Sequence, residues 1–129
     1  MTNYKVLVDS SVWIDYFKTG GLSVLDRLIE EDLVCINEII FTELAPLLMK
    51  KKENIALEGL RAIDRIPFQI DWDIIRAYQL FNLERGINKV GIPDLIILQQ
   101  VIEYKLTLFS FDKHFKMMST FLTFDQFEI

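Results

Sequence analysis

Four acidic residues are spread along the chain in settings that a folded α/β protein could bring together: Asp9, Glu43, Asp94 and Asp112. Asp9 directly follows Val6-Leu7-Val8, an apolar run typical of a strand buried on both faces of a parallel sheet. The carboxyl ends of such strands form the edge where open α/β sheets bind ligands. We therefore take the first strand and its terminal carboxylate as the reference point for the other acids.

The other three acids occur in contexts that could return to this edge. Asp112 ends a strand predicted over Leu106–Phe111, and Glu43 lies on a helix that begins at Asn37. Asp94 follows Gly91-Ile92-Pro93 and opens a helix predicted to reach Tyr104, which is apolar on most sides and therefore expected in the interior. Two acids thus end strands, and two belong to helices that leave the same edge.

Each acid also has an ordinary structural role to consider. Asp9 and Asp94 are in position to cap helices, although Ser10 and Ser11 can cap the first helix without Asp9. Glu43 read alone fits a solvated helix face. Asp112 read alone fits a loop.

The combination indicates metal chemistry, because clustered carboxylates repel one another unless cations lie among them. Oxygen ligands suit Mg²⁺ or Mn²⁺ rather than zinc, and Ser11 could add a hydroxyl that holds a ligand or water. One or two such ions can activate water and stabilise the leaving oxygen in phosphodiester hydrolysis. No nucleophilic triad competes with this interpretation, because His114 and Cys35 are the sole histidine and cysteine.

The remaining pattern alternates short strands with helices, which predicts a parallel α/β sheet. We expect one domain over residues 1–129. Further strands are predicted at 33–36, 67–70 and 121–124, and the clearest amphipathic helix at 72–85. Pro46 lies inside the helix that carries Glu43 and is expected to kink it or to end its first part.

Composition sets outer limits on these interpretations. Apolar residues make up 51% of the 129, so a filled core is expected and disorder is not. The lone cysteine, the lack of a signal-peptide pattern at the start and the absence of a long apolar run favour a reduced, cytoplasmic protein. A net charge of −5 opposes indiscriminate nucleic-acid binding, but metal ions neutralising the four acids would largely remove this objection.

Four motifs, in order and at suitable spacing, resemble those of the PIN-domain ribonucleases, and most closely the VapC-type toxins of toxin–antitoxin pairs: VDSSVWIDYF at 8–17, FTEL at 41–44, GIPDLIIL at 91–98 and LFSFDKHF at 108–115. The resemblance implies a three-layer α/β/α sandwich and a Mg²⁺- or Mn²⁺-dependent endoribonuclease. It also implies a homodimer and a VapB-type antitoxin whose C-terminal segment covers the acidic site. The family's acidic positions carry over to Asp9, Glu43, Asp94 and Asp112, with Ser11 as a polar helper.

This chain departs from the family pattern at two positions near the last acid. Ser110 stands where threonine is frequent, and His114 stands where some members have a further acid. Lys113, Lys116 and Lys89 are the candidate phosphate contacts, together with Lys50–Lys52, although each lysine read alone fits a solvated surface. Lys113 and Lys116 are favoured because they adjoin Asp112. Trp13 and Tyr16 could stack a base, but their helical spacing favours core packing or a partner interface.

An excess of aromatic residues predicts self-association: Trp13, Phe17, Trp72, Tyr78 and Phe81.

Two other classes of function need comparison. A catalytically silent RNA- or protein-binding module would share the fold, but would be expected to lose some of the four acids. A haloacid-dehalogenase-type phosphatase needs an aspartate where Ser11 stands, and a receiver domain needs paired acids after the first strand, so both are disfavoured.

Overall fold

The fold is a central parallel sheet flanked by helices, in a computed structural model that describes residues 5–128. The described chain contains these elements in order: β1 (Val6–Val8), α1 (Ser10–Thr19), α2 (Ser23–Glu30), β2 (Val34–Ile36), α3 (Glu38–Lys50), α4 (Asn54–Ala62), β3 (Asp64–Arg65), α5 (Trp72–Glu84), α6 (Ile92–Glu103), β4 (Thr107–Phe109), α7 (Lys113–Met118) and β5 (Asp125–Gln126). The strand order is β3-β2-β1-β4-β5, and every neighbouring pair is parallel. The predicted three-layer α/β/α class is confirmed.

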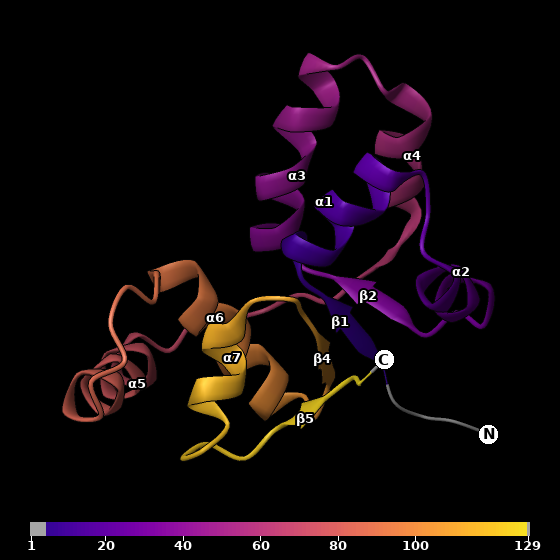
Figure 1. Cartoon of the computed structure of the whole chain (residues 1–129). Coiled ribbons are helices and arrows are strands. Elements are labelled where there is room, and N and C mark those ends of the chain that lie inside the picture. The colour runs from indigo at the N-terminus through magenta and orange to yellow at the C-terminus, as the bar shows by residue number, and fades with distance from the viewer. Residues whose placement is uncertain (1–4, 129) are drawn as a thin grey trace.

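The middle of the sheet is β1, as its uninterrupted apolar run predicted. Val6, Leu7 and Val8 have no exposed surface, and β1 pairs with β2 on one side and β4 on the other. Figure 1 shows α1, α3 and α4 above this strand, with α5, α6 and α7 to the other side. The carboxyl end of β1 therefore lies where the two groups of helices meet.

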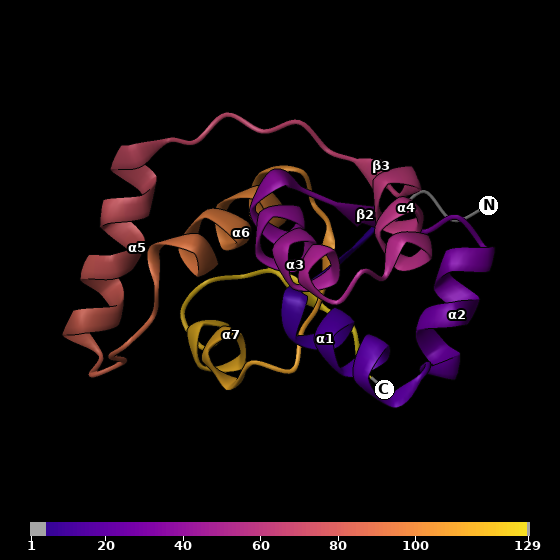
Figure 2. The ribbon, with the colours of Figure 1, turned by 90° about the horizontal axis from the view of Figure 1, so that it is seen from above.

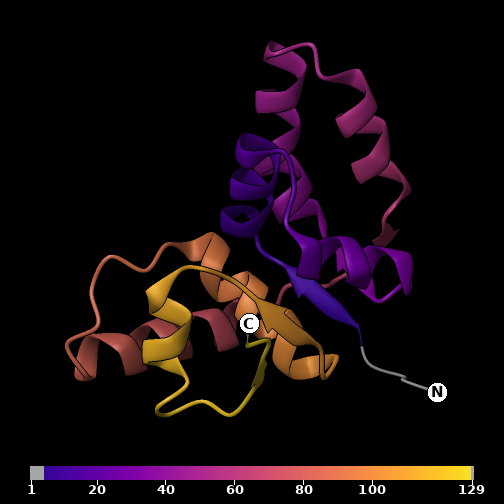
Figure 3. The same ribbon diagram turned by 45° about the vertical axis from the view of Figure 1, so that its right-hand side comes forward.

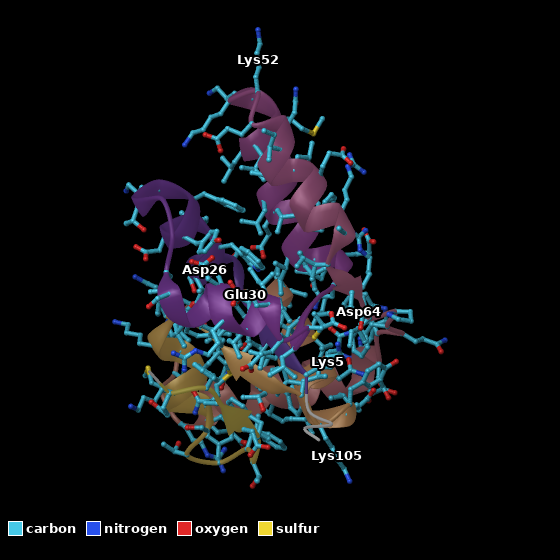
Figure 4. The ribbon with its side chains drawn as sticks, turned by 90° about the vertical axis from the view of Figure 1, so that its right-hand side faces the viewer. Lys5, Asp26, Glu30, Lys52, Asp64 and Lys105 are labelled. Carbon is cyan, nitrogen blue, oxygen red and sulfur yellow. The ribbon has the colours of Figure 1, made fainter. Side chains whose placement is uncertain are left out.

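The helices give the molecule an elongated outline. α5 and α2 lie at opposite ends when the molecule is viewed from above (Figure 2). α3 and α4 stand side by side as a hairpin that projects from the body (Figure 3). Lys52 marks the tip of this hairpin, whereas Lys5 and Asp64 lie together near the starts of β1 and β3, with 3.8 Å between nitrogen and oxygen (Figure 4). No helix in the described part of the chain is long and apolar enough to cross a membrane.

Two predicted strands are wrong in position, and the hydrogen bonds explain why. The Ile66 amide makes the last bond to β2, donating to the Ile36 carbonyl at 2.9 Å. β2 ends at Ile36, because Asn37 already caps α3, so β3 lies before Pro67, over Asp64–Arg65, rather than after it.

The strand predicted at 121–124 forms later, at β5. The amides of Phe121 and Leu122 turn back to the Met118 carbonyl and close the turn that follows α7. Pairing with β4 begins only at Asp125. The apolar character of the earlier residues reflects packing against the core rather than strand formation.

Helix boundaries follow the sequence signals with two adjustments. α6 begins at Ile92 rather than Asp94, because Pro93 is well accommodated in a first helical turn, where its missing amide costs nothing. α3 continues through Pro46 to Lys50. Pro46 and Thr42, whose carbonyl loses its helical partner, are both exposed to solvent. The helix predicted at 72–85 is confirmed as α5.

Candidate active site

Asp9 is buried at the junction of β1 and α1, with 4% of its surface exposed. It occupies the N-cap position of α1, the ordinary structural role considered for it, but its side chain makes no capping bond to the backbone. Instead, Oδ2 accepts hydrogen bonds from the hydroxyls of Ser11 and Ser110, each at 2.9 Å. No described residue donates to Oδ1. The carboxylate is thus fixed in orientation with one oxygen available to a ligand.

The two serines connect β1 to the segment that follows β4. The amide of Phe111 donates to the Ser11 hydroxyl at 3.1 Å, and the amide of Asp112 donates to the Ser110 hydroxyl at 3.0 Å. Each hydroxyl can therefore accept from the backbone while it donates to Asp9. Ser11 was predicted as a polar helper; Ser110 was not proposed as a site residue. A hydroxyl near the end of the strand predicted over Leu106–Phe111, at a position where the family frequently has threonine, was the available signal.

Asp112 is the N-cap of α7, three positions beyond the end of β4. Its Oδ1 accepts from the backbone amide of His114 at 2.9 Å, and Nδ1 of the same histidine lies 3.0 Å from that oxygen. Asp112 can therefore cap α7 and also take part in the site, because the contacts with His114 use only Oδ1 of its carboxylate.

Asp94 lies in the first turn of α6 and is partly buried. Its pKa is raised from the ordinary 3.8 to about 6, firstly by loss of hydration and then by the charges of Asp9, Asp112 and Glu43, with His114 opposing. Because charges act strongly only over short distances in a screened medium, this pattern places Asp94 within the field of the other three acids.

Glu43 extends from α3, and it is the most exposed of the four acids. Its pKa is also raised, firstly by desolvation of the carboxyl group and then by the charge of Asp9, whereas a hydrogen bond with Ser10 lowers it. Asp9 and Asp112 thus follow two neighbouring strands at the carboxyl edge of the sheet, and Asp94 and Glu43 lie close enough to Asp9 for its charge to raise their pKa. Their mutual repulsion makes this edge a natural place for a cation.

The basic and aromatic candidates divide into two groups. Lys113, Lys116 and Lys89 are exposed, the first two on α7 directly after Asp112. Trp13 has only 2% of its surface exposed, so the predicted packing in the core is confirmed and its ring is not accessible for stacking on a base. Tyr16 is partly buried, and its hydroxyl donates to Asp26 on α2.

The arrangement of donors sets a limit on metal binding. Within residues 5–128, no group of three or more His, Cys, Asp or Glu side chains is placed to hold a metal ion. The donor chemistry nevertheless fits a hard divalent cation, since Mg²⁺ commonly uses one or two carboxylates and completes its shell with waters and substrate phosphates.

The family of the chain is established by its sequence. Residues 6–119 match the family model described as PIN domain, and the chain belongs to this family. No curated protein sequence matches the chain.

Solved structures agree on the fold at low sequence identity. The DNA-bound VapBC of Salmonella typhimurium matches with a TM-score of 0.77 and 15% identity, covering 96% of this chain and 97% of that one. VapBC2 of Rickettsia felis, bound to a DNA fragment from their promoter, matches at 0.73 and 17%, covering 95% and 98%. FitAcB of Neisseria gonorrhoeae matches at 0.69 and 19%, covering 95% and 96%.

Proposed function

We propose that this protein is a VapC-type toxin, a Mg²⁺- or Mn²⁺-dependent endoribonuclease that hydrolyses RNA phosphodiester bonds. The observation that carries the proposal is that Asp9, Asp112 and Glu43 lie close enough to Asp94 for their charges to raise its pKa, at the carboxyl edge of a PIN-family sheet. Membership of the PIN family supports a nuclease. The metal and the RNA substrate are inferred from the chemistry of the site.

A divalent ion at this edge would be held by oxygens of Asp9 and Asp94, with Glu43 and Asp112 as further ligands or as acceptors for bound water. When bound, such an ion supplies a Lewis acid that activates water and stabilises the departing oxygen. Ser11 and Ser110 hold Asp9 in orientation through Oδ2.

RNA would reach the site along the surface beside α7. Lys113 and Lys116 are exposed on this short helix, directly after Asp112, and Lys89 is exposed in the loop that leads to α6. These ammonium groups would contact phosphates and position the chain without reading its sequence. Hydrolysis by water needs no 2′-hydroxyl, so the preference for RNA would come from binding.

We also propose a VapB-type antitoxin as the partner, as in the VapBC complexes that this fold resembles. An apolar groove of about 210 Å³ beside α1 offers a surface for it, and its walls include Ile14, Phe17 and Leu47. Ile14 and Leu47 are each more than two-fifths exposed, and exposed apolar side chains gathered in one groove are typical of an interaction site. A homodimer, a single functional domain over 1–129 and a cytoplasmic location complete the proposal.

A catalytically silent binding module is the second candidate. The observation in its favour is that the described residues place no three metal-binding side chains together. In that case the acids would be retained for binding or folding, and no metal-dependent cleavage would occur.

The test compares the purified protein with an Asp94→Asn variant prepared in the same way, on total cellular RNA with Mg²⁺ or Mn²⁺. The proposal predicts discrete fragments from the wild type, none with a chelator and none from the variant. Equal cleavage by both proteins would indicate a contaminating nuclease. If the wild type also shows no metal-dependent cleavage, the silent binding module is favoured.

A further inference from the structure

The helix that carries Asp94 lacks a feature that usually fixes the rotation of a helix about its axis. α6 is buried on nearly all sides through aliphatic residues that share one character: Leu95, Ile96, Ile97, Leu98 and Val101. A helix normally turns its polar stripe to solvent and its apolar stripe to the core. A helix without that division, packed through similar aliphatic side chains, is poorly specified in rotation by apolar contacts alone.

Two consecutive buried glutamines on α6 make directional hydrogen bonds to neighbouring elements instead. Gln99 and Gln100 have no exposed surface. Oε1 of Gln100 accepts from Nδ2 of Asn37 at 2.7 Å, and its Nε2 donates to the carbonyl of Ile66 at 3.2 Å. Asn37 is itself 2% exposed, so this pair of amides is bonded inside the core, where an unpaired polar group is expensive.

Gln99 makes its bonds in a different direction, because successive residues of an α-helix are about 100° apart around the axis. Its Oε1 accepts from the amide of Asp71 at 3.1 Å, at the start of α5, and its Nε2 donates to Glu103 at 2.9 Å. The two glutamines therefore connect α6 to two different neighbours. Rotation of α6 in either sense would break at least one of these connections.

The bond between Asn37 and Gln100 also joins the two helices that carry acids of the site. Asn37 caps α3 by accepting from the amide of Ile40 at 2.8 Å, and Glu43 is six positions further along that helix. Gln100 is six positions after Asp94 on α6. A side-chain atom about 5–6 Å from a helix axis moves by roughly 1 Å for a rotation of about 10°, whereas a ligand set tolerates only about 0.5 Å.

We propose that Asn37 and Gln100 are positioning residues, whose buried amide pair sets the rotation of α6 and so holds Asp94 in register with Glu43 and Asp9 for divalent-cation binding. This inference rests on the proposed function. The pair acts through the helices and touches neither the cation nor RNA.

The experiment measures Mn²⁺ affinity by electron paramagnetic resonance of the free ion, with no RNA present. The test variant is the double change Asn37→Ser with Gln100→Met. Serine keeps the cap of α3 but is too short to reach α6, and methionine keeps the volume of glutamine. Replacing both partners together leaves neither polar group of the pair unsatisfied. The matched control is Asn82→Leu, which removes another fully buried amide whose bonds go to Gln79 and Met118 rather than to α6.

We expect the double variant to fold, as judged by urea unfolding and near-ultraviolet circular dichroism, and to bind Mn²⁺ about tenfold more weakly than the wild type, the loss typical when support of a metal site is removed. The control should keep wild-type affinity. If the double variant fails to fold, the single change Asn37→Ser serves in its place. It keeps the cap but leaves Oε1 of Gln100 without its donor, so it should be less stable than the wild type and bind Mn²⁺ about tenfold more weakly.

Wild-type affinity in the folded test variant would overturn the positioning role while leaving the proposed function intact. An equal loss in the control would also overturn it, because the effect would then follow from any buried amide. A wild-type protein that binds no Mn²⁺ would refute the proposed function itself, and the positioning role with it.

Discussion

Replacing Asp94 by asparagine should make the metal-free protein more stable at neutral pH, although it removes a residue of the proposed site. The folded-state pKa of Asp94 is about 6, against 3.8 for an ordinary aspartate. The folded protein therefore holds this proton more tightly than the unfolded chain does. Its stability should fall as pH rises from about 4 to about 6, and the full loss should persist at higher pH.

The magnitude follows from the size of that rise. At about 1.36 kcal/mol for each pKa unit, a fully buried group would lose about 3 kcal/mol. The Asp94 side chain is only partly buried, and screening by solvent reduces the expected loss to about 1–2 kcal/mol. Asparagine has the same shape and no charge, so Asp94→Asn should recover this amount. For a chain of this length the gain corresponds to roughly 3–8 °C in melting temperature.

The assay is thermal unfolding in a chelator at pH 4 and pH 8, with Asp125→Asn as the control. Asp125 is an exposed acid on the edge strand β5, and its replacement tests the general benefit of removing one charge from a protein of net charge −5. Asp94→Asn should raise the melting temperature at pH 8 and have little effect at pH 4. The reasoning is refuted if the variant melts at or below the wild-type temperature at pH 8, or if its gain is equal at both pH values.

Three further predictions concern residues around the site and in the core. Ser110→Ala should leave the fold intact and lower RNA cleavage about 10–100-fold, because Asp9 loses a bond that orients it; unchanged turnover would show that Ser11 alone suffices. Burial raises the pKa of the Cys35 thiol to about 12, so a disulfide reagent at pH 8 should label the urea-unfolded protein and not the native one, and rapid native labelling would contradict this. Tyr16→Phe should lower the free energy of unfolding by about 1–2 kcal/mol through loss of the bond to Asp26; urea unfolding measures it, and an unchanged midpoint would mean that water replaces the bond.

The sequence was sufficient to locate the sheet and its acidic edge because both depend on local signals. The apolar run Val6–Val8 is typical of a buried strand, and the pairing of β1 with β2 and β4 confirms this prediction. The acid that follows a strand is carried to the sheet edge by the strand itself. The strands at the two ends of the sheet were misplaced, because each pairs through only two residues, too few to leave a periodic pattern.

The contacts that orient the acids could not be predicted, since they join residues far apart in the chain. Ser110 is 101 positions from Asp9, and Gln100 is 63 positions from Asn37. A serine after a strand and a glutamine in an apolar helix are each compatible with many environments. Their partners become apparent only once β1 lies beside β4 and α3 lies near α6.

The serine hydrogen bonds to Asp9 and the amide pair of Asn37 and Gln100 restrain different acids of the site. Carboxylates at one edge repel one another, so the edge relaxes unless something holds each acid in place. Asp9 is held by direct hydrogen bonds from Ser11 and Ser110, which are possible because it is buried at a strand end. Asp94 has no comparable donor among the described hydrogen bonds, so its position depends on the rotation of α6. Apolar packing resists separation of α6 from the core far more than it resists rotation, and the amide pair at Gln100 supplies the directional restraint that packing lacks.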